Sequence, residues 1–366
     1  MHFLVSRDIL RKELSIAQSV VEKKTTIPIL VNVLLKVEGG FLKIVATDLD
    51  VTYHSRVPVE VKKEGSATVM ASKLSEIFSL LPDGDVEVNL KDHGKLHIGA
   101  QNVNYDLSVL PEEDYPKVPY VEEKRGIEVD FKMLQDGLLR TLPSVSMEEY
   151  RYQLGGVCFK VEEKNLELAS TDGHRLSRVV IKCKIKDKYT FEESIIPRKA
   201  CAELARLDGE ETVIICNFDQ FSAFILNERQ IIARKLQAKF PDYKNYLMDR
   251  GDKTFTIERS KLYDAVRRVS VISLGKYYGI RFLLTKGKLV LDGSHPDIGE
   301  AIEQLEVDYS GEQFQITFNA KYLIDFLSTL SDTTIEVYFK DMKAKATFIP
   351  KEENIDHIYI LMPMTV

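Results

Sequence analysis

The sequence predicts an α+β protein built from three tandem similar domains, each with antiparallel sheets and two helices on one side. Two observations lead to this prediction. A β-hairpin block occurs three times at intervals of one third of the 366-residue chain. A short amphipathic helix stands before and after each copy. Because internal repetition at a fixed interval is the strongest sequence signal of architecture, we place the domains at residues 1–122, 126–247 and 252–366.

The hairpin block is clearest at residues 166–181, where apolar and polar residues alternate on both sides of Asp172-Gly173. Alternation around an Asp-Gly pair is a strong short-range signal for a β-hairpin. Related blocks occupy residues 42–61 and 289–307. The three blocks therefore predict one hairpin at an equivalent place in each domain.

The helices are predicted from apolar residues that recur every three or four positions, the period of one helix face. A strand with alternating residues follows the second helix of each domain, beginning near Val86, Thr212 and Thr334. The predicted helices are 6–24, 71–81, 130–142, 197–207, 258–269 and 319–330.

Charge is distributed unevenly between these helices and the rest of the chain. The net charge is −6, yet the predicted helices carry 16 Lys or Arg and 10 Asp or Glu. Basic residues are common on solvated helix surfaces. The alternative is a basic helical face for a nucleic-acid backbone on an otherwise acidic body. The unpaired cysteine spacing, the lack of a long apolar run and the lack of a signal peptide favour a reduced, cytoplasmic setting without a membrane span.

The sequence contains no recognisable catalytic, nucleotide-binding or metal-binding motif, so it gives little sign of catalysis, and we expect no metal or cofactor. Asp48 and Asp50 at the first hairpin could hold Mg²⁺, or they could be ordinary turn acids. Asp172 and His174 could form an acid–base pair, or a turn acid with a partly exposed histidine beside it.

The chain end is unusually apolar, because a predicted last strand from Ile358 to Met364 includes Met362-Pro363-Met364. It could be an edge strand buried in the third domain. It could also be an exposed shelf for a partner, since methionine side chains adapt to different ligands and proline suits an edge position.

Five segments together resemble the bacterial DNA polymerase III beta subunit family, the DNA sliding clamps. They are TIPIL around Ile27-Pro28, TDLD at 47–50, TDGHRL at 171–176, FPDY at 240–243 and MPM at 362–364. The likeness also covers chain length and the three-copy layout. It implies a head-to-tail homodimer that closes into a ring around duplex DNA, with helices lining the hole. It further implies a function without catalysis, the tethering of the replicative polymerase, clamp loader and repair proteins through short linear peptides.

The resemblance also implies three sets of site residues. Those implied for a partner-peptide cleft are Leu154, Thr171, Gly173, His174, Arg175, Leu176, Pro241, Ile360, Met362, Pro363 and Met364. Those implied for DNA contact are Lys24, Tyr152 and Gln153. Those implied for the dimer interface are Tyr105 and Leu107 on one protomer with Val271 and Ile272 on the other.

Asn245 and Tyr246 depart from the family pattern of a basic and then an aliphatic residue, which affects the expected rim of the cleft. Two other functions remain as alternatives. One is a nucleic-acid-binding protein whose domains form an open array without a ring, which hydrodynamic mass would distinguish. The other is a metal-dependent hydrolase using Asp48, Asp50 or Asp172, which activity with Mg²⁺ would reveal.

Overall fold

The computed structural model describes residues 1–22, 26–91, 94–122, 125–185, 189–209, 211–248, 250–273 and 278–364. The chain divides into two compact units. Unit 1 contains Met1–Lys132, Lys184–Glu192 and Lys199–Lys235, and unit 2 contains Met133–Cys183, Glu193–Arg198 and Leu236–Val366. The second sequence repeat is therefore shared between the two units. Elements that cross the division are given below with the unit that holds most of their residues.

Unit 1 contains the first repeat and half of the second. Its elements are β1 (His2–Ser6), α1 (Arg7–Val20), η1 (Pro28–Val31), β2 (Asn32–Glu38), β3 (Phe41–Thr47), β4 (Val51–Pro58), β5 (Glu60–Lys63), β6 (Gly65–Met70), α2 (Ala71–Leu80), β7 (Asp85–Lys91), β8 (Lys95–Ala100), β9 (Val103–Ser108), η2 (Glu112–Asp114), β10 (Ile127–Asp130), α4 (Arg198–Arg206), β15 (Thr212–Phe218), β16 (Phe221–Leu226) and β17 (Arg229–Arg234).

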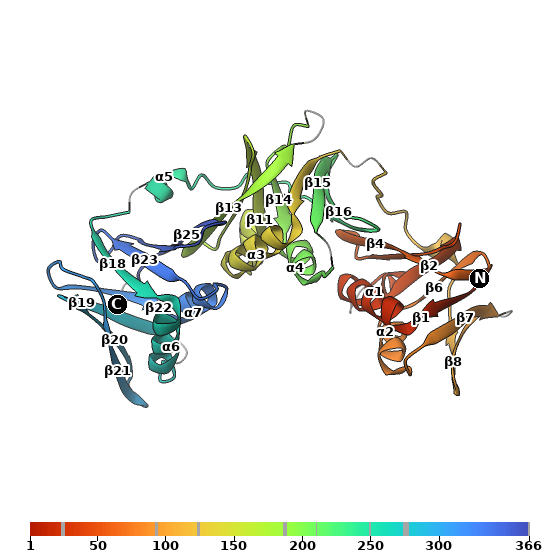
Figure 1. The fold of residues 1–366 in the computed structure, drawn as a ribbon, viewed down its shortest axis with the longest axis horizontal. Helices are drawn as coiled ribbons and strands as arrows, with labels where there is room; N and C mark the ends of the chain where they lie inside the picture. Colours follow the sequence, from red (N-terminus) through yellow and green to blue (C-terminus); the bar gives the residue numbers. More distant parts are fainter. Residues whose placement is uncertain are drawn as a thin grey trace. The chain divides into compact units, whose positions relative to one another are not determined.

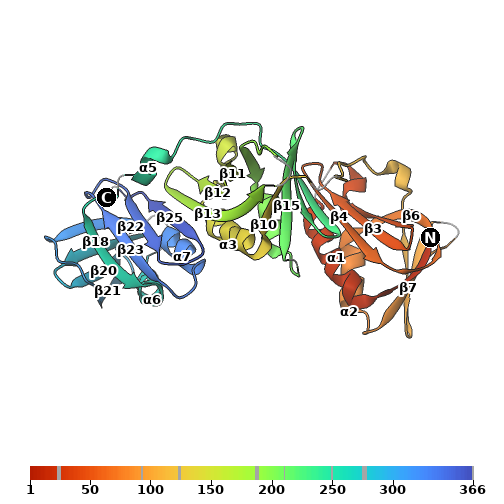
Figure 2. The same ribbon diagram turned by 45° about the horizontal axis from the view of Figure 1, so that its top comes forward.

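Two antiparallel sheets and a helix pair form the first repeat (Figures 1 and 2). One sheet has the strand order β5-β1-β7-β8-β9, and the other runs β6-β2-β3-β4 and continues through β17, β16 and β15 to β10. Helices α1 and α2 pack against each other, and α1 also contacts β1, β3 and β4. Each helix buries one apolar face between the sheets, as expected for an amphipathic helix.

The pairing of β4 with β17 joins the first repeat to the second within unit 1. A buried ion pair supports this joint. The Glu13 carboxylate of α1 accepts hydrogen bonds from the Arg229 guanidinium of β17, with Nη2–Oε1 at 2.5 Å, and from the hydroxyls of Tyr53 and Ser55. Glu13 is 5 % exposed, and a carboxylate buried this deeply requires such partners.

Unit 2 contains the other half of the second repeat and the whole third repeat. Its elements are α3 (Phe131–Thr141), η3 (Leu142–Ser144), η4 (Glu149–Leu154), β11 (Gly156–Glu162), β12 (Asn165–Thr171), β13 (Arg175–Ile185), β14 (Ser194–Pro197), α5 (Lys244–Met248), β18 (Lys253–Glu258), α6 (Arg259–Ser270), β19 (Gly279–Thr285), β20 (Lys288–His295), β21 (Gly299–Glu306), β22 (Phe314–Asn319), α7 (Ala320–Ser328), β23 (Thr334–Phe339), β24 (Ala346–Pro350) and β25 (Asp356–Leu361).

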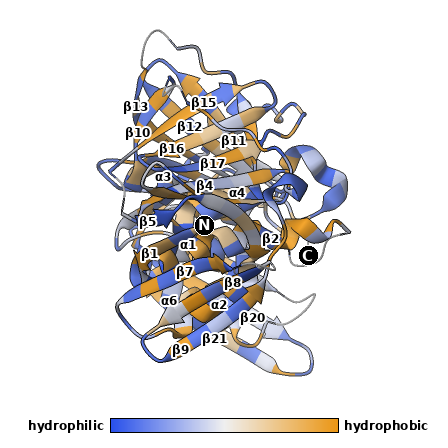
Figure 3. Cartoon of the chain, turned by 90° about the vertical axis from the view of Figure 1, so that its right-hand side faces the viewer, coloured by the Kyte–Doolittle hydropathy of each residue, from blue (hydrophilic) through white to orange (hydrophobic). Residues whose placement is uncertain are grey.

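The third repeat has the same plan as the first. One sheet runs β21-β20-β19-β22, and the other runs β18-β23-β24-β25 and continues into β13 of the second repeat. Helices α6 and α7 pack together and cover these strands. Phenylalanines fill the core, with Phe326 stacked on Tyr359 at a centroid distance of 4.2 Å. Figure 3 shows hydrophobic and hydrophilic residues mixed along the strands, as half-buried sheets require.

All six predicted helices and the three predicted hairpins are present, so the prediction of three tandem α+β domains is confirmed. Five helices agree with the predicted bounds within two residues, whereas α1 ends at Val20 instead of Lys24. Val21 is extended, with φ −62° and ψ 150°, and this conformation ends the helix. Helix α5 was not predicted. Among the described residues, none of the helices has the length and hydropathy needed to cross a membrane.

The last strand was predicted too long. Strand β25 ends at Leu361, and the next three residues lie outside the sheet ladder. The physical reason is that Pro363 has no N–H to donate, while the Met362 and Met364 N–H groups bond to His174 and Thr317. The tail is therefore an irregular segment held at two points.

Candidate functional site

An apolar cluster lies on one face of the sheet formed by β11, β12, β13 and β25, and we call it the cleft cluster. Strand β13 pairs with β25 so that Leu176 is opposite Ile360, and both side chains are buried. Leu236 packs against the cluster from the segment before α5, and Leu247 packs against it from α5 itself. The buried members are Leu154, Cys158, Ala169, Leu176, Ile195, Phe240, Tyr243, Ile358 and Ile360.

The turn between β12 and β13 lies at the end of this cluster, and Asp172 organises it. The Asp172 carboxylate accepts hydrogen bonds from the backbone N–H of His174 at 2.9 Å and of Arg175 at 3.0 Å. Gly173 has φ +88°, and a Cβ there would lie 2.7 Å from Arg151 Nη1. The positive φ therefore favours glycine at this turn, whereas the tip of the Arg151 side chain could move away from an added Cβ.

The chain tail runs from this turn to strand β22. The Met362 N–H donates to the His174 carbonyl at 2.9 Å, and the Met364 N–H donates to the Thr317 carbonyl at 2.8 Å. Met362 is 38 % exposed although its backbone is held. An exposed apolar side chain on a fixed backbone beside a buried apolar cluster is the arrangement expected at a peptide-binding groove.

Arg175 has different neighbours from Leu176, because successive residues of a strand point to opposite faces. Its guanidinium lies 3.0 Å from Asp172 and 2.8 Å from Asp325 of α7, and it stacks over the Tyr322 ring at 4.2 Å. Its side chain is 8 % exposed. This side chain joins the second repeat to α7 on the other face of β13. The assignment of Arg175 to the partner-peptide cleft stays a prediction.

The structure brings some of the expected cleft residues together and separates others. Leu154, Leu176 and Ile360 belong to one cluster, whereas Pro241 is exposed at its edge. Thr171 closes the turn by donating its hydroxyl to the Arg175 carbonyl, and Pro363 is half-buried in the tail.

The sequence analysis did not select Phe240 and Tyr243, although both lie in the FPDY segment that it used. Tyr243 donates a hydrogen bond to the Glu167 carboxylate, and burial together with this bond raises the pKa of its phenol. The signal that could have found them is the presence of two aromatic residues in a segment otherwise rich in polar residues. Asn245 and Tyr246 lie in α5, where both are exposed.

Two of the three residues expected to contact DNA are exposed in η4. Tyr152 is 54 % exposed and Gln153 is its neighbour. Arg151 ties η4 to the turn by donating to the Asp172 carbonyl. Lys24 lies outside the described residues.

The expected interface residues lie on separate elements at the surface of each unit. Tyr105 and Leu107 are half-buried on β9, which is an edge strand because, among the described residues, it pairs with β8 alone. Val271 is 73 % exposed after the end of α6, and Ile272 beside it is half-buried. Ile302 on the edge strand β21 was not predicted for the interface and is 66 % exposed.

The candidate catalytic acids serve as turn residues. Asp48 accepts from the backbone N–H groups of Asp50 and Val51 and pairs with Lys199 at 2.5 Å. This repeats the role of Asp172 in the second hairpin. Within the described part of the chain, no group of three potential metal ligands was found.

Comparisons with known proteins agree with this architecture over the whole chain. Family models for the N-terminal, central and C-terminal domains of the DNA polymerase III beta subunit match residues 1–119, 128–242 and 247–365. The beta sliding clamp of Pseudomonas putida is 34 % identical over 368 residues, covering 100 % of both chains. That of Caulobacter vibrioides is 33 % identical over 374 residues, again covering 100 % of both.

Solved structures give the same result. The DNA polymerase III subunit beta from Pseudomonas aeruginosa has a TM-score of 0.90 and 33 % identity, covering 100 % of both chains. A clamp from the same organism bound to griselimycin has a TM-score of 0.92 and 32 % identity, with the same coverage. With three matched domains and relatives aligned from end to end, the chain belongs to the bacterial DNA polymerase III beta subunit family, the DNA sliding clamps.

Proposed function

We propose that this chain acts as a DNA sliding clamp, a homodimeric ring that encircles duplex DNA and tethers the replicative polymerase without catalysing a reaction. The observation that carries this proposal is the end-to-end likeness to beta sliding clamps. We further propose that the protein is cytoplasmic, works without a cofactor, and consists of domains at 1–122, 126–247 and 252–366.

Ring closure requires two complementary edges. We propose that the edge strand β9, with Tyr105 and Leu107, meets the third domain of the other protomer near Val271, Ile272 and Ile302. A head-to-tail contact that closes gives a ring, whereas one that does not close gives filaments. The exposed Val271 and Ile302 at one edge and the half-buried Tyr105 and Leu107 at the other support this pairing.

The ring holds DNA by topology, and its direct contacts to DNA are weak. We propose that Lys24, Tyr152 and Gln153 contact the duplex. An ordinary DNA-binding protein that neutralises 6–10 phosphates loses roughly 10³–10⁵ in affinity between 50 and 200 mM salt. A closed ring on circular DNA should not show this loss, because it cannot dissociate without opening.

The test follows from this difference. Protein loaded on nicked circular DNA should survive a high-salt wash and should leave after the circle is cut once. Equal loss from circular and linear DNA would refute the ring. Sedimentation of the free protein supplies the second measurement, since a closed ring must be at least a dimer.

We propose that partner proteins bind through short peptides placed over the cleft cluster and beside Met362-Pro363-Met364. The buried Leu154, Leu176 and Ile360 provide the floor for apolar anchors, and the tail provides an exposed rim. Peptide grooves of this kind take most of their binding energy from a few buried anchors.

Griselimycin provides a defined probe of this site, since it is bound in the structure of a Pseudomonas aeruginosa relative. Met362→Ala should weaken griselimycin binding by about 2 kcal/mol, or roughly thirtyfold, if Met362 is one of these anchors. Met70→Ala is the matched control, because Met70 is 45 % exposed against 38 % for Met362 and lies in unit 1. Equal affinities of the two variants in a calorimetric titration would place the site elsewhere.

A further inference from the structure

A cavity of about 450 Å³ lies on the sheet β2-β3-β4 of the first repeat. We call it the domain 1 pocket. Leu34, Val45 and His54 are directly opposite one another on the three strands and form a largely apolar part of its wall. The pocket lies on the face opposite to α1, because Tyr53 and Ser55, which alternate with His54 along β4, hydrogen-bond to Glu13 of that helix.

The segment after β9 covers part of this face and holds the pocket open. The Tyr115 hydroxyl donates to the Val45 carbonyl at 3.2 Å. His54 Nε2 lies 2.8 Å from the Pro119 carbonyl, and the ring of Tyr120 stands edge-on to His54 at 5.1 Å. Burial lowers the pKa of His54 to about 4, so this histidine is neutral at pH 7. The covering segment is thus anchored to the sheet at Tyr115 and at Pro119.

Three cations form a row across the same strands. Lys36 is directly opposite Lys43, and Lys43 is directly opposite Arg56. Like charges at directly opposite positions destabilise a sheet, so this row needs compensation. Glu112 lies 3.1 Å from Lys36, and Glu38 lies 2.8 Å from Lys43, so each lysine has a carboxylate partner.

These ion pairs leave all three cations partly accessible to solvent. The side chains of Lys36, Lys43 and Arg56 are 40 %, 40 % and 38 % exposed. Glu228 is 3.4 Å from Arg56 and 54 % exposed, so solvent screens this pair. Arg56 Nε is buried without a hydrogen-bond partner in the described structure, and the Arg56 guanidinium lies over the Phe41 ring at 4.2 Å.

In the second repeat, the protein's own residues cover the equivalent face of the sheet and balance its charges. There Lys160 is opposite Glu167, and Glu167 is opposite Val180, so no row of like charges forms. Phe240 and Tyr243 belong to the cluster that covers the face. The cation row of the first repeat therefore has no counterpart at the equivalent described positions of the second repeat.

We propose that the domain 1 pocket is a second peptide-binding site, which takes an acidic segment with an aromatic or large aliphatic side chain beside an Asp or Glu. The apolar side chain would lie against Leu34 and Val45, and the carboxylate would pair with the row of cations. The volume is sufficient for one or two side chains and excludes a duplex. This site does not depend on ring closure or on the cleft of unit 2.

The probes are two blocked peptides, Gly-Phe-Asp-Glu-Gly and its neutral counterpart Gly-Phe-Asn-Gln-Gly, titrated calorimetrically into the full-length protein at low salt. The acidic peptide should bind about tenfold more tightly than the neutral one, since charge-assisted pairs are about twice as strong as neutral ones. Equal binding of both peptides, or no binding of the acidic peptide up to about 5 mM, a level of negligible affinity, would overturn the proposal.

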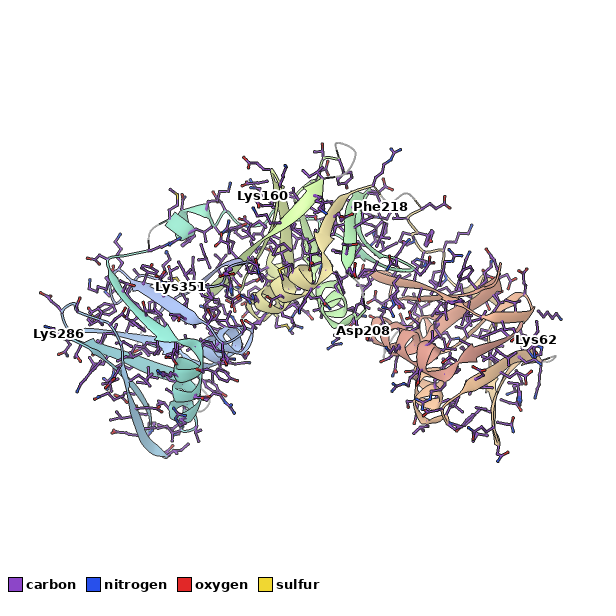
Figure 4. The ribbon with its side chains drawn as sticks, viewed as in Figure 1. Lys62, Lys160, Asp208, Phe218, Lys286 and Lys351 are labelled. Carbon is purple, nitrogen blue, oxygen red and sulfur yellow. The ribbon has the colours of Figure 1, made fainter. Side chains whose placement is uncertain are left out.

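Lys43→Gln removes the central cation and should reduce affinity for the acidic peptide to that for the neutral one. Its melting temperature should change little, because the loss of the exposed pair with Glu38 is offset by the relief of repulsion within the row. Lys62→Gln is the matched control, since Lys62 (Figure 4) is an exposed lysine on β5 of the same domain and does not line the pocket. The same loss in both variants would show a nonspecific effect of net charge and would refute the site.

Three further measurements distinguish this site from the cleft of unit 2, from a site for small carboxylates and from DNA binding. Val45→Phe should fill the pocket and abolish binding of the acidic peptide while griselimycin binding stays unchanged. Sodium 3-phenylpropionate carries the same ring and carboxylate without a peptide backbone. If it bound as tightly as the acidic peptide, the pocket would be a site for small carboxylates, and the assignment to peptides would be wrong. Lys43→Gln should be retained on circular DNA like the unmodified protein.

Discussion

Replacing Arg175 by alanine should destabilise unit 2 without removing the peptide cleft. In the structure this guanidinium bridges Asp172 and Asp325 and covers the Tyr322 ring. After truncation, Asp172 and Asp325 both lose the cation that they share. They are only 14 % and 27 % exposed, so water cannot fully replace it.

The size of the effect follows from the burial of the pair. Removing one member of a buried ion pair costs about 3–5 kcal/mol, and loss of the stacking contact adds about 0.5–2 kcal/mol. Partial exposure of Asp325 favours the lower end, so we expect about 4 kcal/mol. In a unit of this size, each kcal/mol lowers the melting temperature by about 2–4 °C. Arg175→Ala should therefore melt about 8–16 °C lower.

Calorimetric melting of three variants tests this reasoning. Arg175→Lys keeps the charge but cannot bridge two carboxylates with one planar group, so it should recover less than half of the loss. Lys261→Ala is the surface control, because Lys261 and Glu258 are 61 % and 58 % exposed, and such pairs contribute about 1 kcal/mol or less.

A melting temperature of Arg175→Ala within the range of Lys261→Ala would show that the buried bridge is not a stabilising element. Griselimycin titration of the same protein at 20 °C provides the second readout. Binding should persist, because Arg175 and Leu176 are on opposite faces of β13. If Arg175→Ala is still folded but loses as much griselimycin affinity as Met362→Ala, then Arg175 contributes to the cleft and this prediction is wrong.

Three other predictions follow from the structure. Deleting Met362–Val366 should abolish binding of a polymerase-derived peptide while sedimentation still shows a dimer; an unchanged peptide affinity would refute the tail site. Changing Leu107 and Ile272 to aspartate should give folded monomers, because unpaired charge in an apolar interface is costly, and a persisting dimer would show that the interface is misplaced. Burial lowers the pKa of His54 to about 4, so the unfolded chain takes up the proton first. The stabilising contribution of His54 is complete above about pH 6.5 and falls by about 1.4 kcal/mol per pH unit towards pH 4. His54→Gln should make the melting temperature less dependent on pH in this window, and an identical pH dependence would contradict the assignment.

The repeated elements could be predicted because their signals are local. The hairpin at Asp172-Gly173 and the helix faces depend on residues a few positions apart, and the structure confirms both. The tail was predicted less well, since Pro363 indicated an edge position but not that the Met362 and Met364 N–H groups would bond to residues far away in the sequence. Strand length there is decided by tertiary partners, which periodicity does not reveal.

In the candidate site, too, features set by local sequence could be predicted, and features set by tertiary contacts could not. Leu176 and Ile360 are apolar residues of alternating strands, and their burial follows from the pattern. The position of Arg175 on the opposite face also follows from alternation, but the resemblance placed it with Leu176 in the cleft. The row of Lys36, Lys43 and Arg56 could not be predicted, because it depends on the register between three strands, and a shift of one residue would separate these charges.

The joint between the first two repeats has a consequence for how the chain could be divided. Strand β4 pairs with β17 from Val51 to Ser55, and Arg229 reaches Glu13 of α1. The Gln230 side chain bonds to the backbone of Val121 at both its N–H and its carbonyl. These contacts do not require the covalent link between the repeats. A fragment of residues 1–122 should therefore assemble by complementation with a coexpressed fragment of residues 126–366. The sheet built from strands of both fragments would hold them together in place of the missing peptide link.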